Sequence, residues 1–106
     1  MPDEPLAADL LQRTAATFGL LSATARLHIM WLLAEDERDV GTLAAELGQS
    51  VATVSHHLAK LKLAGLVRSR RDGKRQIYLV DDPHVVEIVR LAVRHHQPRS
   101  RERRTG

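Results

Sequence analysis

The feature that most constrains the fold is a pair of short helical patterns, separated by Gly48-Gln49-Ser50 and followed by two β-prone runs. The first pattern covers residues 40–47 and stops at Gly48, a residue that readily ends helices. Ser50 is a favourable N-cap for the second pattern, which runs to about Ala64 and stops at Gly65. Beyond it, LVRSRR and RQIYLV flank DGK, and Asp-Gly is among the strongest signals of a hairpin turn. This order predicts a helix–turn–helix followed directly by a β-hairpin.

Helical periodicity also predicts two helices before this unit and one after it. Apolar positions have helical spacing from about residue 6 to residue 20. Ser22 is expected to cap a helix that runs to about Glu35, and EDERD then forms a charged break. One face of that helix is expected to carry Leu27, Met30, Trp31 and Ala34. Asp81, Asp82 and Pro83 precede a last helix at about residues 84–96. The expected fold is mainly α with a small β-hairpin (α+β), in the order α-α-α-α-β-β-α.

Composition narrows the class of protein. At 106 residues the chain is long enough for one domain, expected over residues 1–96. Residues 97–106 are expected to form a disordered basic tail, because they have no apolar anchor and no periodicity. The absence of cysteine excludes disulfides, zinc–thiolate sites and cysteine nucleophiles. No apolar run reaches the ~18 residues of a membrane helix, and the acidic N-terminus does not resemble a signal peptide. We therefore expect a cytoplasmic protein with no membrane partner.

The charge is distributed unevenly along the chain. Residues 1–48 hold three Lys/Arg and eight Asp/Glu, a balance of −5, whereas residues 49–80 hold seven Lys/Arg and one Asp, a balance of +6. Residues 81–106 hold six against four, a balance of +2. The positive block coincides with the second helix of the helix–turn–helix and the hairpin. This segment is therefore expected to contact a polyanion.

A helical wheel of the second helix separates a core face from an outer face. Val51, Val54, Leu58 and Leu61 fall on the expected core face. The outer face is small and polar, as suits close approach to base edges in a DNA major groove, while hairpin cations would lie along phosphates. The alternative is an ordinary solvated helix and a charged hairpin, but the conjunction of features favours DNA binding. The candidate DNA-binding residues are Ser50, Ala52, Thr53, Ser55, His56, Lys60, Arg68, Arg70, Arg71, Lys74 and Arg75.

The segment VGTLAAELGQSVATVSHHLAKLKLAGLVRSRRDGKRQIYLV resembles the winged helix–turn–helix of the ArsR/SmtB family of metal-sensing transcription regulators. The most family-specific parts are VSHHLAKLKLAGLV and the hairpin, or wing, that follows it. TARLHIMWLL resembles the preceding helix, so the resemblance covers roughly residues 15 to 96. It implies a homodimer, joined through the terminal helices, on a two-fold operator, usually as a repressor that leaves DNA when metal binds. It also links the position of His56 to coupling between the DNA-binding and sensing helices.

The last helix holds a second constellation, in DPHVVEIVRLAVRHH. Eleven positions at ~100° each bring His95 to within about 20° of His84, yet roughly 16 Å separate them along the helix axis. One metal ion, bonded to nitrogens at ~2.1 Å, cannot reach both within one chain. The geometry works only if two such helices run antiparallel, so that Asp82 and His84 of one subunit meet His95 of the other.

The family resemblance implies the same site, an Asp-x-His followed after ten residues by a second His. The family pattern continues three residues later with His or Glu, where this chain has Pro98. His96 is the candidate to take that place, and an Asp or a water molecule is the alternative. A second family site, a Cys-x-Cys on the third helix, is absent here, because Asp39 and Gly41 occupy the corresponding stretch. The candidate metal ligands are thus Asp82, His84, His95 and His96, and this donor set favours a divalent Ni, Co or Zn ion. Alternatively, these histidines only oppose the helix dipole or lie on the surface.

Other interpretations stay open at this point. The chain is either a metal-responsive regulator or a metal-independent one, which would be controlled by a partner protein or by its own level and could activate transcription. A winged-helix module that binds an acidic protein partner is a further alternative. An enzyme is not expected, because Ser55 and His56 lie about 100° apart on the helix and cannot easily form a nucleophile–base pair. His57 is expected to serve packing, and His28 to be structural or exposed.

Overall fold

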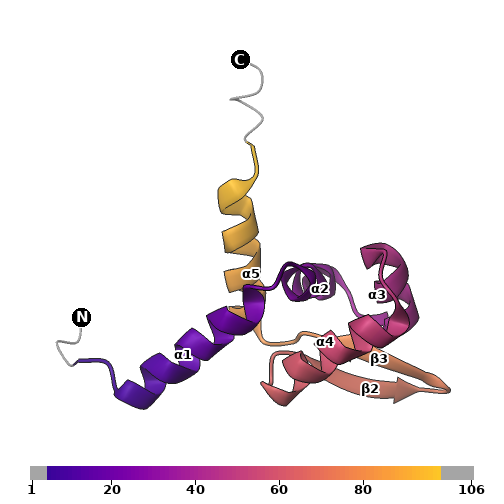
Figure 1. Cartoon of the computed structure of the whole chain (residues 1–106), viewed down its shortest axis with the longest axis horizontal. Helices are drawn as coiled ribbons and strands as arrows, with labels where there is room; N and C mark the ends of the chain where they lie inside the picture. The colour runs from indigo at the N-terminus through magenta and orange to yellow at the C-terminus, as the bar shows by residue number, and fades with distance from the viewer. Residues whose placement is uncertain (1–4, 99–106) are drawn as a thin grey trace.

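The computed structural model describes residues 5–98 and confirms a mainly α fold with a small β-hairpin (Figure 1). The expected helices and hairpin strands are present, and a two-residue strand lies within the expected charged break. That strand pairs antiparallel with the second hairpin strand, so the sheet has three strands in the order β1-β3-β2. The elements are α1 (Ala8–Leu21), α2 (Thr24–Glu35), β1 (Arg38–Asp39), α3 (Val40–Leu47), α4 (Val51–Leu63), β2 (Arg68–Asp72), β3 (Arg75–Leu79) and α5 (Pro83–His96).

Local chemistry sets the boundaries of the helix–turn–helix and the wing. Gly48 ends α3 with a φ of 69°, in the left-handed region that glycine adopts without a steric penalty. The Ser50 side chain accepts a hydrogen bond from the Thr53 backbone N–H and so caps α4 as expected. In the wing, Asp72 pairs with Arg75, which leaves Gly73 and Lys74 as a two-residue turn, and Gly73 has a φ of 65°.

The expected cap at Ser22 is wrong. Ser22 is instead the C-cap of α1, and its Oγ donates a hydrogen bond to the Gly19 carbonyl at 2.6 Å. α2 begins after Ala23, which makes no side-chain cap. The Gly19 carbonyl also accepts from the Ser22 backbone N–H at 3.3 Å, so both donors of Ser22 serve the end of α1 and the side chain does not cap α2.

The hydrophobic core lies among α2, α3, α4 and the segment that leads into β2. On α2, Met30 is buried as expected, but Ile29 and Leu33 are buried too, while the other expected positions, Leu27, Trp31 and Ala34, are only partly buried. Leu27 and Trp31 still pack against the core, but the predicted face was incomplete, because α2 packs against α1, α3, α4 and α5 together. The buried apolar residues are Leu21, Ile29, Met30, Leu33, Leu43, Ala44, Val54, Leu58, Leu61, Leu66, Val67, Ile77 and Val89.

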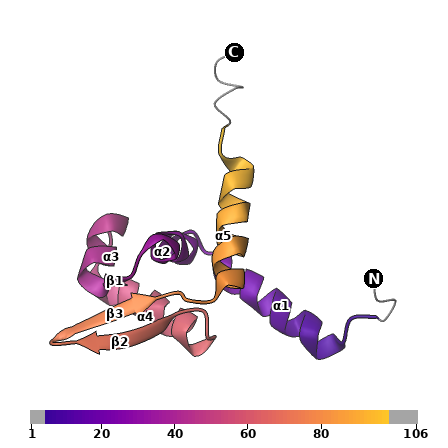
Figure 2. The same ribbon diagram turned by 180° about the vertical axis from the view of Figure 1, so that it is seen from behind.

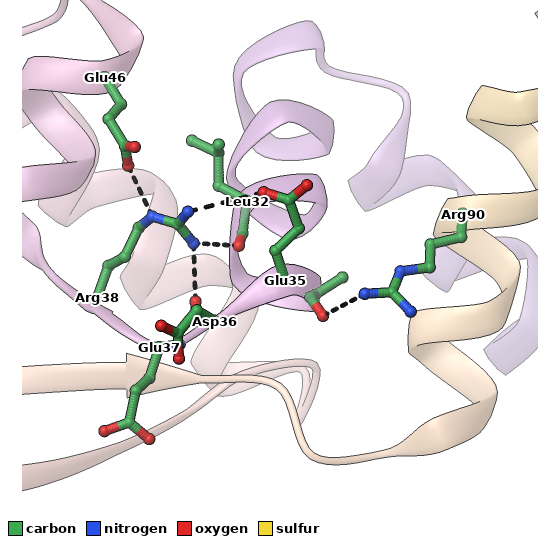
Figure 3. Close-up of polar contacts among 8 residues, drawn as sticks. Leu32, Glu35, Asp36, Glu37, Arg38, Glu46 and Arg90 are labelled. Atoms are coloured by element: carbon green, nitrogen blue, oxygen red, sulfur yellow. Dashed lines mark hydrogen bonds and ion pairs between the residues drawn. The ribbon is translucent and has the colours of Figure 1, made fainter. Parts of the chain in front are cut away.

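Two arginines bind the carbonyls at the C-terminal end of α2 (Figure 3). The Arg38 guanidinium is 16% exposed, donates to the carbonyls of Leu32 and Asp36, and pairs with Glu46 of α3 at 2.7 Å. From the opposite side, Arg90 of α5 donates to the Ala34 carbonyl at 2.9 Å. The Leu32 carbonyl also accepts from the Asp36 backbone N–H at 3.3 Å. Carbonyls at a helix C-terminus lack their full set of helical partners, so the two arginines provide donors and join α3 and α5 to α2.

The two terminal helices, α1 and α5, project from the rest of the molecule. α1 and α5 project from one side, whereas the β2–β3 hairpin extends past α3 on the other (Figures 1 and 2). The Cα radius of gyration is 16.3 Å, compared with about 13 Å for a compact domain of this length. No single helix among residues 5–98 is long and apolar enough to cross a membrane. Only α1 and α2 together, bent by 94° at their junction, reach that length and composition.

Candidate nucleic-acid interface

The outer face of α4 has the character that the sequence predicts. Val54, Leu58 and Leu61 are completely buried, which fixes the rotation of the helix about its axis. Val51 was expected beside them but is 50% exposed, because it lies in the first turn, ahead of the buried residues. The exposed outer positions are Ala52, Thr53, Ser55, His56, Ala59 and Lys60. α4 therefore presents small and polar side chains to solvent, with a lysine at the edge.

The start of α4 is held by two hydroxyl groups. Ser50 Oγ accepts from the Thr53 backbone N–H at 3.1 Å and donates to Thr53 Oγ1 at 2.9 Å. The N-terminal turn of a recognition helix is the part that usually reaches base edges. Both hydroxyls are exposed, and each retains hydrogen-bonding capacity for a base or a phosphate.

The two adjacent histidines of α4 have different surroundings. His56 is exposed on the outer face, whereas His57 is half-buried and faces α2. Arg26 of α2 has Nη1 3.4 Å from His57 Nδ1, and its Nε donates to the Leu20 carbonyl of α1 at 2.8 Å. Since a guanidinium can only donate, His57 accepts here through an unprotonated nitrogen. Burial, and then the positive charge of Arg26, lower the pKa of His57, so the neutral imidazole links α4 to α1 and α2.

The wing carries the five expected cations, but three of them already have carboxylate partners. Arg68 pairs with Asp81 at 2.6 Å, Arg75 pairs with Asp39 at 2.8 Å, and Arg70 pairs with Glu37. Arg71 makes only a long hydrogen bond of 3.5 Å to Gln76. Lys74, at the turn, makes no hydrogen bond or ion pair within residues 5–98.

Sequence reasoning missed the two acidic partners from the charged break. Glu37 precedes β1 and Asp39 belongs to it, and one residue separates them, so in an extended segment their side chains lie on the same face. The alternation of Glu37 and Asp39 with Arg38 in EDERD was the sequence signal that could have indicated this shared acidic face. The arginines they bind lie 33 and 36 residues further along the chain.

The candidate metal ligands lie at the two ends of α5. Asp82 caps the helix, because its Oδ1 accepts from the His84 backbone N–H at 2.9 Å, and the same oxygen lies 3.6 Å from His84 Nδ1. At the other end the rings of His95 and His96 meet edge to face, 4.8 Å between centroids. Within residues 5–98 of one chain, no group of three or more His, Cys, Asp or Glu residues is close enough to hold a metal ion.

An apolar groove runs between the projecting helices. It has a volume of about 920 Å³, and its lining includes Phe18 of α1, Ile88 and Leu91 of α5, and both C-terminal histidines. Phe18 is 56% exposed, Leu91 60% and Ile88 40%. Side chains of this size rarely form a contiguous exposed patch on a monomeric protein unless the patch binds something.

Comparison with known proteins shows that residues 24–69 match the model of a protein family described as "Bacterial regulatory protein, arsR family". The HTH-type transcriptional regulator KmtR of Mycobacterium tuberculosis is 39% identical over 85% of this chain and 69% of its own length. A cadmium resistance transcriptional regulatory protein CadC homolog of Staphylococcus aureus is 39% identical, over 76% of this chain and 68% of its own length. The homodimeric winged helix-turn-helix DNA-binding domain Mb0332 of Mycobacterium bovis has a TM-score of 0.76 and 33% identity, covering 93% of this chain and 99% of that domain.

Proposed function

Because this chain belongs to the ArsR/SmtB family and is a DNA-binding transcription regulator, we propose that it acts as a homodimer on a two-fold operator. We propose further that a divalent transition metal held between the α5 helices controls its affinity for that operator. The relatives are transcriptional regulators, which confirms the expectation that the protein is not an enzyme. The metal and the operator symmetry belong to the proposal.

The apolar groove between α1 and α5 carries the proposal of a homodimer. Burying Phe18, Ile88 and Leu91 against a second copy would remove large exposed apolar side chains from water, the main driving force for association. The related Mycobacterium bovis domain is homodimeric, and it covers almost this whole chain. A two-fold axis between terminal helices would present two α4 helices and two wings to successive turns of the same duplex.

The surface formed by α4 and the wing is the proposed DNA-binding face. Ser50, Ala52, Thr53, Ser55 and His56 would approach base edges in the major groove. Lys60 and the wing cations Arg68, Arg70, Arg71, Lys74 and Arg75 were all predicted to contact DNA. The named residues of α4 and the wing cations are all exposed, and positive charge is concentrated in this segment of the chain. Both observations support the assignment.

The chemistry of the α5 residues fits a borderline metal ion such as Ni, Co or Zn. Imidazole nitrogens and a carboxylate suit these ions, and all four candidate side chains are exposed. Within one chain the donors lie at opposite ends of a 14-residue helix, so a site requires residues from two subunits. Asp82 and His84 of one subunit, with His95 and His96 of the other, would hold the ion. A bound ion would join the two α5 helices and thereby fix how the subunits are oriented.

Operator binding with and without metal tests the proposal. DNA from the region upstream of the protein's own coding sequence is titrated with the protein in the presence of Ni, Co or Zn, and the fluorescence anisotropy of the DNA is measured. Metal is expected to weaken operator binding at least tenfold. His84→Ala and His95→Ala should each remove that response and leave metal-free binding intact.

His28→Ala is the matched control, because His28 also lies outside the core but on α2. Specific binding that no metal changes would overturn the metal proposal and support a regulator controlled in another way, by a partner protein, including one that activates transcription. If no duplex bound even at low salt, a winged-helix module for an acidic protein partner would be the better interpretation of the basic face.

A further inference from the structure

The two faces of the three-stranded sheet are chemically different. Arg38, Tyr78 and Ser69 are register partners and share one face. That face meets the helices, because Arg38 binds the end of α2 and Lys62 of α4 donates to Ser69 Oγ at 2.7 Å. Asp39, Ile77 and Arg70 are also register partners, so their side chains share the opposite, outer face.

Two ion pairs cross this outer face. β3 is the central strand, yet Arg70 of β2 pairs with Glu37, which precedes β1 at the far edge. That pair therefore spans the sheet over the row that contains Ile77. Arg75 lies two residues from Ile77 on β3, and its Nε donates to Asp39 Oδ2 of β1 at 2.8 Å. Ile77 is only 4% exposed although it faces away from the helices.

Asp39 joins the wing to the helix–turn–helix through a single carboxylate. Its Oδ1 accepts from the Thr42 backbone N–H at 2.7 Å and caps α3, while its Oδ2 accepts from Arg75. Hydrogen bonds from Thr42, and then from Arg75, lower the pKa of Asp39 to about 2, so the carboxylate is ionised wherever the protein is folded at ordinary pH. Both oxygens are thus occupied by partners on different elements.

Two wing cations, Arg71 and Lys74, are not held in this way. Arg71 lies on the other face from Arg70, and its hydrogen bond to Gln76 stays within the hairpin. Lys74 occupies the turn itself, beside Gly73. The wing therefore has two cations, Arg70 and Arg75, bound to carboxylates at or beside β1, and two others, Arg71 and Lys74, available to a phosphate.

We propose that Glu37–Arg70 and Asp39–Arg75 are positioning pairs that hold the wing at a set angle to the helix–turn–helix, while Arg71 and Lys74 make the wing's phosphate contacts. This inference rests on the proposed DNA-binding face and divides the wing cations assigned to it. Exposed ion pairs contribute little to folding stability, so their consequence lies in orientation. A wing held at the correct angle allows α4 and the wing to meet one duplex at the same time.

The salt dependence of DNA binding separates the two roles. Each lost phosphate contact reduces the slope of log affinity against log salt by about 0.9. Arg71→Gln and Lys74→Gln should each reduce the slope by that amount on operator and on random DNA. Arg70→Gln and Arg75→Gln should keep the wild-type slope and lower the ratio of operator affinity to random-DNA affinity severalfold.

The carboxylate partners provide the matched variants. Glu37→Gln should reproduce Arg70→Gln, and the double variant should be no worse than either single variant, because the pair acts as a unit. Asp39→Asn keeps an acceptor for the α3 cap but removes the charge facing Arg75, so it should reproduce Arg75→Gln without unfolding the protein. Arg13→Gln, which removes an exposed cation of α1, controls for net charge.

Different outcomes reject different claims. A reduced slope for Arg70→Gln or Arg75→Gln, or tighter binding with a steeper slope for Glu37→Gln, would overturn the positioning role while leaving DNA binding by the wing in place. Wild-type protein that binds no duplex at all would overturn the proposed function, and this inference with it. Unchanged operator selectivity in all four ion-pair variants (Glu37→Gln, Asp39→Asn, Arg70→Gln and Arg75→Gln) would show that the wing angle does not depend on these pairs.

Discussion

The body of the molecule, from α2 to β3, and the two terminal helices use apolar residues in opposite ways. All but two of the buried apolar side chains belong to the body, whereas α1 contributes only Leu21 and α5 only Val89. The terminal helices instead expose Leu10, Leu11 and Phe18 on α1, and Ile88 and Leu91 on α5. The body thus completes most of its own core within one chain, while α1 and α5 carry the exposed apolar surface of the proposed dimer interface. In the proposed dimer, folding and association would therefore depend on different segments of one short sequence.

Truncation of a core leucine should have the largest effect. Leu58 of α4 is completely buried, so Leu58→Ala removes packed methyl groups and leaves a cavity. We expect the free energy of unfolding to fall by about 2–5 kcal/mol. Urea unfolding followed by circular dichroism measures this at several protein concentrations.

Leu63→Ala provides the control in the same helix, because Leu63 is 92% exposed. Its effect should stay within about 0.5 kcal/mol. Similar losses for the two variants would contradict the placement of the core.

A charge in the apolar groove should have the next largest effect, and on a different quantity. Leu91→Asp would place a carboxylate among apolar side chains of the proposed dimer interface. If Leu91 is an anchor contributing ~2 kcal/mol, the dimer dissociation constant should rise by about 30-fold. Sedimentation velocity measures the change, and the helical circular dichroism signal should be retained.

Leu63→Asp introduces the same charge at an exposed leucine of the body and should leave the dimer unchanged. If the Leu91→Asp protein remained dimeric over the same range of protein concentrations as the wild type, α5 would not be the contact between subunits.

Loss of the α4 cap should have a smaller effect. Ser50→Ala removes the acceptor for the Thr53 backbone N–H and should lower the free energy of unfolding by about 1 kcal/mol. Ser50→Asn retains an acceptor and should recover most of that loss. The same urea titration compares the three proteins, and an unaltered midpoint for Ser50→Ala would indicate that water replaces the cap at no cost.

The smallest effect should be a pH dependence from His57. Its pKa in the folded protein lies below the ordinary value of 6.5, so below that pH the unfolded chain binds more protons than the folded one. The stabilising contribution is therefore complete above pH 6.5 and declines as the pH falls through the window between 6.5 and the lowered pKa. Unfolding free energies of wild type and His57→Gln, measured at pH 7.5 and pH 5.5, test this. The wild type should lose more stability between the two pH values than the variant.

Local signals accounted for much of the fold. The bounds of α3, the caps at Gly48 and Ser50 and the turn at Gly73 follow from residues within a few positions of one another, and the structure confirms them. β1 could not be predicted in this way. Its two residues have no strand pattern of their own, and they are extended because β3 offers them hydrogen-bonding partners.

Among the candidate site residues too, those fixed by local periodicity could be predicted from the sequence, and those that depend on distant residues could not. The exposed and buried faces of α4 follow from helical periodicity, and the structure differs from that prediction at Val51 alone among its four core positions. By contrast, nothing near Arg70 or Arg75 in the chain indicates that Glu37 and Asp39 bind them. The pairing of Asp82 and His84 with His95 stays a prediction, because it depends on how two chains meet.

The sequence by itself determined the helix–turn–helix, the hairpin and the family, because caps, turns and periodicity act between near neighbours in the chain. Only the tertiary structure decided which wing cations are engaged by carboxylates, which apolar side chains remain exposed and how α5 is joined to α2. Those outcomes depend on contacts between residues far apart in sequence, such as Arg90 and Ala34, 56 positions apart. Such contacts arise from the packing of whole elements, and no short pattern encodes them.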